Sequence, residues 1–89
     1  MASTSTNPSL EEIKGYDTEQ LVTFLRRNLN LTEDEFAILR GQRVSGFVFL
    51  RLTERKLLKS PYNLLGGTAS VIAELVERLN QSRFYHKIV

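Results

Sequence analysis

The sequence predicts an all-α domain, a compact bundle of five helices in which the last helix is the longest. Three observations favour this fold class. Small polar residues that cap helices recur just before apolar segments. Apolar residues in the final third recur at spacings of three and four. No segment sustains the alternation of a strand, and the one β-like run, Phe47–Leu50, is too short to pair.

Length and composition restrict the class of protein further. The chain has 89 residues, enough for one domain with one modest core, and its 42% hydrophobic and 25% charged residues are typical of globular proteins. It has no cysteine, which excludes disulfides and thiolate metal sites. It has no apolar run long enough to span a membrane, and residues 1–9 do not resemble a signal peptide. We therefore expect an intracellular protein, cytoplasmic or nuclear, without membrane attachment.

We expect three segments along the chain. Residues 1–14 form a flexible N-terminal tail, residues 15–83 the helical domain and residues 84–89 a C-terminal tail. Within the first segment, Ser9 and Glu12 have the spacing of a capping box, which predicts a short helical turn. Such a turn is marginal unless Leu10 and Ile13 dock on the domain.

The first two helices of the domain have similar start signals. Asp17 caps the first, with Gln20 as the reciprocal partner, and this helix ends near residues 28–30. Thr32 and Glu35 form a capping box for the second. Gly41 is placed to follow the end of this second helix.

Three further helices complete the bundle. Ser45 begins a short one, and Thr53 begins another that stops at Ser60-Pro61. Residues 62–67 form a loop, and Thr68 is a candidate cap for the longest helix. The apolar face of that helix is formed by Ala69, Ile72, Val76 and Leu79.

Charge is distributed unevenly along the sequence, although the net charge is only +2. Residues 9–35 hold seven acids against three bases, whereas residues 36–59 hold six bases against one acid. A domain with an acidic part and a basic part attracts an oppositely charged partner or a copy of itself.

Residues that could support catalysis are scarce. His86 is the one histidine and lies in the expected C-terminal tail, so no catalytic triad is predicted. The glycines of Gly66-Gly67-Thr68 lack the lysine of a phosphate-binding loop. Carboxylates at 33–35 are explained by the start of a helix, where they complement the helix dipole. We expect no enzyme, no metal and no cofactor.

The order of these features resembles the sterile alpha motif (SAM) domain. An aromatic residue precedes a capped helix, a short acidic helix follows, and a block with Ser-Gly, Leu-x-Leu-Thr-Glu and Leu comes next. The matching segments are Tyr16–Leu25, Asn28–Leu31, Phe36, Arg43–Leu57, Leu64, Gly67 and Ile72. The chain departs from the family in having Tyr16 where tryptophan is common, Tyr62-Asn63-Leu64 where Leu-Gly-Ile is common, and no basic residue at the start of the last helix.

The resemblance implies two binding faces, since SAM domains commonly associate through two different surfaces. The face that we call mid-loop-like comprises Glu33, Asp34, Glu35, Phe47, Val48 and Arg51. The face that we call end-helix-like comprises Lys59, Asn63, Leu64, Gly67, Thr68 and Ser70.

Phe47 and Val48 stand at two positions that are usually exposed in the family. If exposed here, they form an apolar spot beside basic residues, as at many binding hot spots. The alternative is that Phe47 turns into the core or is covered by the Leu10/Ile13 segment.

The resemblance implies a protein-interaction module that scaffolds or recruits another SAM domain or a different protein. Head-to-tail self-polymerisation is an alternative, disfavoured by the uncharged start of the last helix. RNA binding is the least favoured, because the basic residues expected there are missing.

Overall fold

The computed structural model describes the backbone of residues 8–88 and the side chains of residues 8–81. This part of the chain is all-α and contains no strand, which confirms the predicted fold class. Its six helices are α1 (Leu10–Lys14), α2 (Thr18–Asn28), α3 (Glu33–Gly41), α4 (Gly46–Phe49), α5 (Glu54–Leu58) and α6 (Gly66–Ile88).

The predicted caps account for most helix starts. Ser9, Asp17 and Thr32 each begin a helix with a complete capping box, in which side chain and backbone bond reciprocally across three residues. Ser45 and Thr53 accept hydrogen bonds from the amides of the third residues of α4 and α5. Because each cap acts within one turn, these starts follow from local sequence.

The bundle has one helix more than the five that we expected. The additional helix is α1, which the sequence indicated only as a marginal turn. Ile13 is completely buried and Leu10 packs against the core, so tertiary contacts stabilise a helix too short to form alone.

The end of α3 differs from the prediction. Gly41 is the last helical residue, and it is Arg43 that adopts the left-handed conformation, with φ of 54°. The amide of Val44 donates to the carbonyl of Leu39, and the amide of Arg43 to that of Arg40, which is a Schellman ending. Glycine is usual at the left-handed position, but the chain reaches this position two residues after Gly41.

Both ends of α6 lie outside the expected limits. The helix begins at Gly66, so Thr68 lies inside its first turn and is not the cap. At the other end the backbone stays helical to Ile88, so residues 84–88, which we expected as a tail, continue α6.

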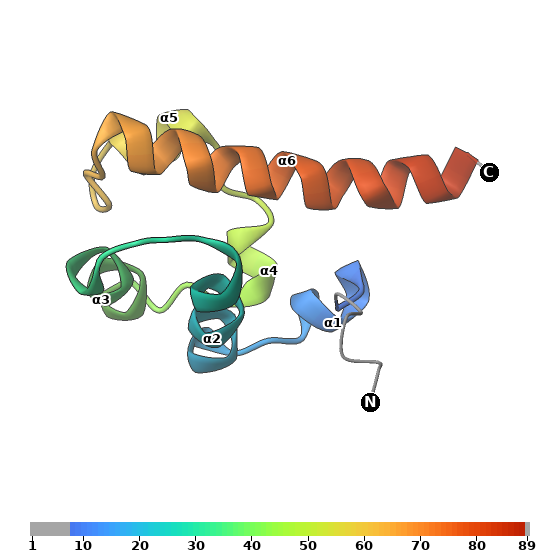
Figure 1. The fold of residues 1–89 in the computed structure, drawn as a ribbon, viewed down its shortest axis with the longest axis horizontal. Coiled ribbons are helices and arrows are strands. Elements are labelled where there is room, and N and C mark those ends of the chain that lie inside the picture. Colours follow the sequence, from blue (N-terminus) through green and yellow to red (C-terminus); the bar gives the residue numbers. More distant parts are fainter. Residues whose placement is uncertain (1–7, 89) are drawn as a thin grey trace.

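The helices form two groups around one core (Figure 1). In that view α6 runs along the top with α5 beside it, α2 and α3 lie below its first half, and α1 lies below its second half. The short α4 occupies the middle. Buried apolar side chains from all six helices form one cluster. Asn80 on α6 also donates to the carbonyl of Leu50 at the end of α4, 3.1 Å away.

Gly46 is the point of closest approach between α4 and the segment after α1. Its amide donates to the carbonyl of Tyr16, at 3.0 Å. A Cβ atom at Gly46 would lie 1.7 Å from the carbonyl oxygen of Ile13. Only glycine allows this approach, and it sets the orientation of α4 and of the two residues that follow.

Candidate interaction surfaces

The helix α4 presents two apolar side chains to solvent. Its Phe49 is buried in the core, whereas Phe47 is 52% exposed and Val48 is 39% exposed. Successive residues of a helix point about 100° apart, so burying Phe49 turns Phe47 outward. The sequence left two alternatives open for Phe47, exposed or covered, and with about half of its surface exposed the side chain is not part of the core.

These side chains lie at the edge of a groove of about 440 Å³ between α4, α5 and the segment that leads to α6. We call it the α4–α5 groove. Its lining residues are Phe47, Val48, Arg51, Leu52, Lys56, Lys59, Ser60, Pro61 and Tyr62. Three of the nine are basic and none is acidic, so the groove combines an apolar surface with positive charge.

Two contacts hold Arg51 in place at the groove. Its guanidinium carbon lies 5.8 Å from the centre of the Phe47 ring, within the range of a cation–π interaction. Its carbonyl accepts a hydrogen bond from Lys56 Nζ, at 3.2 Å. The second contact also joins the end of α4 to α5, so basic side chains from both segments meet at the groove.

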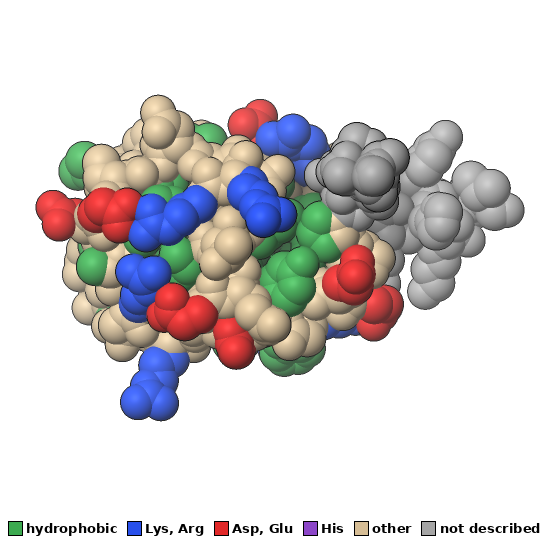
Figure 2. Space-filling view, turned by 60° about the horizontal axis from the view of Figure 1, so that its bottom comes forward, with side chains coloured by type: hydrophobic (Ala, Val, Ile, Leu, Met, Phe, Trp, Pro, Cys, Tyr) green, Lys and Arg blue, Asp and Glu red, His purple; other side chains and the backbone are tan. Residues whose placement is uncertain are grey.

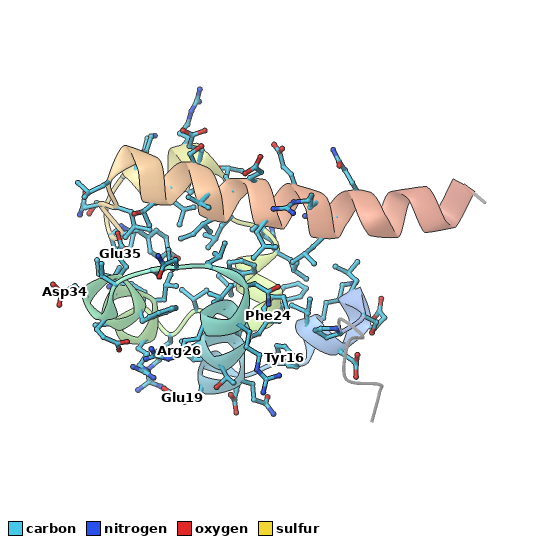
Figure 3. The ribbon with its side chains drawn as sticks, in the orientation of Figure 1. Tyr16, Glu19, Phe24, Arg26, Asp34 and Glu35 are labelled. Atoms are coloured by element: carbon cyan, nitrogen blue, oxygen red, sulfur yellow. The ribbon has the colours of Figure 1, made fainter. Side chains whose placement is uncertain are left out.

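The acidic residues at the start of α3 have three different environments. Glu33 forms a bidentate ion pair with Arg26, whose second nitrogen lies 2.8 Å from Glu33 Oε1. The hydrogen bonds from Arg26 hold the pKa of Glu33 below its ordinary value. Arg26 also lies over the Phe36 ring, 4.5 Å from its centre. Asp34 points away from the domain (Figure 3).

Glu35 faces inward and joins α3 to α6. Its carboxylate accepts hydrogen bonds from the hydroxyl of Thr68 and from the backbone amide of Thr32. These two bonds, the first being the larger influence, lower the pKa of Glu35. Figure 3 shows Glu35 between α3 and the start of α6. Its side chain therefore bridges two elements instead of standing free for a partner.

The residues expected on the end-helix-like face are distributed differently. Leu64 is only 6% exposed and belongs to the core, so its side chain is not available for a surface contact. Asn63 is exposed and has φ of 48°, a conformation that asparagine tolerates better than most residues. Gly67 and Ser70 are exposed near the start of α6.

The structure therefore regroups the residues of the two expected faces. Lys59, expected on the end-helix-like face, lines the α4–α5 groove with Phe47. Thr68, from the same face, bonds instead to Glu35 of the mid-loop-like face. The sequence reasoning did not find Pro61 and Tyr62 as lining residues, since it treated them only as a helix stop and a loop. Lys56 and Lys59, which lie close to Pro61 and Tyr62 in the sequence, were the signal that could have indicated a basic surface at this point.

The side of the molecule shown in Figure 2 differs in charge from the groove. Acidic and basic side chains lie next to each other across this surface. Two ion pairs that join α2 to α3 fit that pattern: Arg26 with Glu33, and Arg40 with Glu19. Where both signs alternate, the field largely cancels, and no strong preference for a charged partner results.

Two kinds of feature are absent from the described part of the chain. Among the side chains of residues 8–81, no three histidine, cysteine or acidic groups are placed so that they could hold a metal ion. Over residues 8–88, no helix combines the length and the apolar character that crossing a membrane requires.

A family model described as the SAM-like domain matches residues 1–78. The chain belongs to the SAM-like domain family. SAM-like domains are non-catalytic and typically serve as interaction modules. No curated protein and no solved structure matches this one. The match covers α1 to α5 and the first half of α6, and thus includes the whole α4–α5 groove.

Proposed function

We propose that this SAM-like domain recruits a partner protein through the α4–α5 groove. The observation that carries the proposal is the exposure of Phe47 and Val48 beside three basic side chains. Burying exposed apolar surface is the main source of affinity in protein association, and aromatic residues next to arginine are common at binding hot spots. About half of the Phe47 side chain is in contact with solvent, and the guanidinium of Arg51 lies over its ring.

The proposed contact residues are a revision of the two faces inferred from the sequence. Phe47, Val48, Arg51 and Lys59 remain, and Lys56, Pro61 and Tyr62 join them because they line the same groove. Leu64 is left out since it is buried, and Glu35 and Thr68 are left out since they bond to each other. Glu33, Asp34, Asn63, Gly67 and Ser70 stay as candidates for a second, separate contact.

Affinity capture with the full chain tests the proposal. We expect Phe47→Ala to lose the proteins that the wild type retains, with little change in melting temperature, because the side chain is half exposed. Leu65→Ala is the matched control: Leu65 is 76% exposed and lies outside the groove. Retention of the same proteins by Phe47→Ala would contradict the proposal, and a large fall in its melting temperature would assign Phe47 to the core.

Head-to-tail self-association is the second candidate. The basic groove and the outward-pointing Asp34 are of opposite charge and lie on different elements, as a heterologous contact requires. Sedimentation velocity over a wide concentration range distinguishes the two. A chain that remains monomeric at the highest concentration excludes self-polymerisation and leaves recruitment of another protein.

An intracellular location, which we also propose, is supported by the absence of cysteine in the sequence.

A further inference from the structure

We infer that the α4–α5 groove binds an acidic protein segment that carries an apolar anchor side chain. This inference rests on the proposed function and specifies the chemistry of the partner.

The charge of the groove is uncompensated. Arg51, Lys56 and Lys59 line it, and among the described residues none of the three forms an ion pair with an aspartate or glutamate. By contrast, Arg26 on α2 and Arg40 on α3 each form an ion pair with a glutamate. Like charges placed together without counter-charges repel one another, so a negatively charged occupant relieves an existing cost as well as adding attraction.

The position of Arg51 suits a carboxylate. Its guanidinium is held over the Phe47 ring, and a guanidinium accepts a carboxylate through two parallel hydrogen bonds. A side chain already restrained by a ring loses less conformational entropy on binding than a free one. Lys56 and Lys59 add two more cations on the same groove, so acidic residues on either side of an anchor each find a partner.

The walls of the groove require an apolar component. Val48, Pro61 and the ring of Tyr62 offer hydrocarbon surface and Phe47 adds an exposed aromatic ring, whereas Leu52 is almost completely buried. A volume of about 440 Å³ is ample for an aliphatic or aromatic side chain, and lies in the usual range for ligand sites. An occupant with charge alone would leave these surfaces in water.

A nucleic acid fits the same groove less well. Single-stranded RNA is held by several aromatic rings that stack on successive bases. Of the aromatic residues that line the groove, Phe47 is exposed but Arg51 lies over its ring, and Tyr62 is partly buried. Three cations also give a short track for phosphates. The aliphatic walls therefore favour a peptide.

Peptide display on the full chain tests the inference, with a random library as the probe. We expect the enriched sequences to combine aspartate or glutamate with leucine, isoleucine, phenylalanine or tryptophan. A synthetic peptide of the consensus should then bind in a fluorescence-polarisation titration. Replacing its acids by the corresponding amides, or its apolar anchor by glycine, should each weaken binding about tenfold. Enrichment of sequences without acids would overturn the inference.

Matched variants locate the site. Lys59→Glu should weaken the consensus peptide about tenfold, whereas Arg55→Glu, the same charge change on α5 outside the groove, should change affinity less than about twofold. Phe47→Ala should weaken it about tenfold and Leu65→Ala should not. Equal loss in Lys59→Glu and Arg55→Glu would mean that general charge, not the groove, attracts the peptide, and would overturn the inference.

The remaining outcomes separate this inference from the proposed function. If display yields no consensus while affinity capture remains dependent on Phe47, the acidic segment is rejected and recruitment of a folded partner stands. If neither shows dependence on Phe47, both are rejected. Tighter binding of a labelled oligouridylate than of the peptide, or concentration-dependent self-association lost in Phe47→Ala, would assign the groove to RNA or to a second copy instead.

Discussion

At the scale of single residues, Gly46 decides how α4 meets the rest of the domain. Its backbone torsion is not the constraint, because no glycine among the described residues has a positive φ. The constraint is space, since a Cβ atom would overlap the backbone of Ile13. Backbone atoms cannot rotate aside as a flexible side chain can. The groove residues that follow Gly46 depend on this contact.

We predict that Gly46→Ala lowers the free energy of unfolding by at least about 2 kcal/mol, since overpacking against backbone forces elements apart. Urea unfolding monitored by circular dichroism measures it. Gly67→Ala is the control. A Cβ atom at Gly67 would meet nothing within 4 Å, and Gly67 lies in α6, where alanine is the better helix former. This control should be neutral or raise stability by about 0.5 kcal/mol. Similar losses in both variants would refute the steric explanation.

At the scale of elements, the turn that follows α3 contains a residue that is poorly suited to its backbone conformation. Arg43 holds a left-handed conformation that costs a residue with a Cβ about 1 kcal/mol relative to glycine. We predict that Arg43→Gly raises the free energy of unfolding by about 0.5–1 kcal/mol, measured by thermal denaturation. Arg43→Ala keeps the Cβ and removes the charge, so it should bring no such gain. An equal gain in Arg43→Ala would point to charge repulsion instead.

The smallest helices depend on their docking residues. Ile13 is the one completely buried side chain of α1, and we predict that Ile13→Ala lowers the free energy of unfolding by about 2–4 kcal/mol. Amide hydrogen exchange should show α1 losing protection first. Leu10→Ala, at a half-buried position, should cost less. An unchanged unfolding free energy would mean that α1 folds apart from the core.

At the scale of the whole molecule, two carboxylates of α3 join this helix to other helices. Glu33 bonds to Arg26 on α2, and Glu35 bonds to Thr68 on α6. Folding lowers the pKa of both below the ordinary glutamate value of 4.5. The deprotonated forms are therefore favoured by the folded state, and their contribution to stability is complete above that value and lost as pH falls through the folded-state pKa values.

We predict that the melting temperature falls on acidification below about pH 4.5, and that Glu35→Gln reduces this fall. The difference in melting temperature between wild type and Glu35→Gln should be largest at neutral pH and shrink toward about pH 3. Asp34→Asn is the control, because this neighbouring carboxylate points away from the domain (Figure 3). A constant difference across the pH range would exclude a role for ionisation of Glu35.

The limits of sequence reasoning are visible in particular residues. Ser9, Asp17, Thr32, Ser45 and Thr53 could all be recognised as caps, because each bonds within three residues of itself. Thr68 has the same chemistry and was misread as a cap. Its hydroxyl had a partner 33 residues away, and no local pattern reveals such a bond.

What the sequence by itself determined is five of the six helices, the caps that begin α1 to α5 and the SAM-like family, because caps and helical spacing act over one or two turns. It also placed Phe47 near basic residues in the chain, but left open whether its side chain is exposed. Only the tertiary structure decided which of these residues share a surface. Lys59 came to lie with Phe47, and Glu35 with Thr68, because the packing of α4, α5 and α6 on one core brings distant segments together.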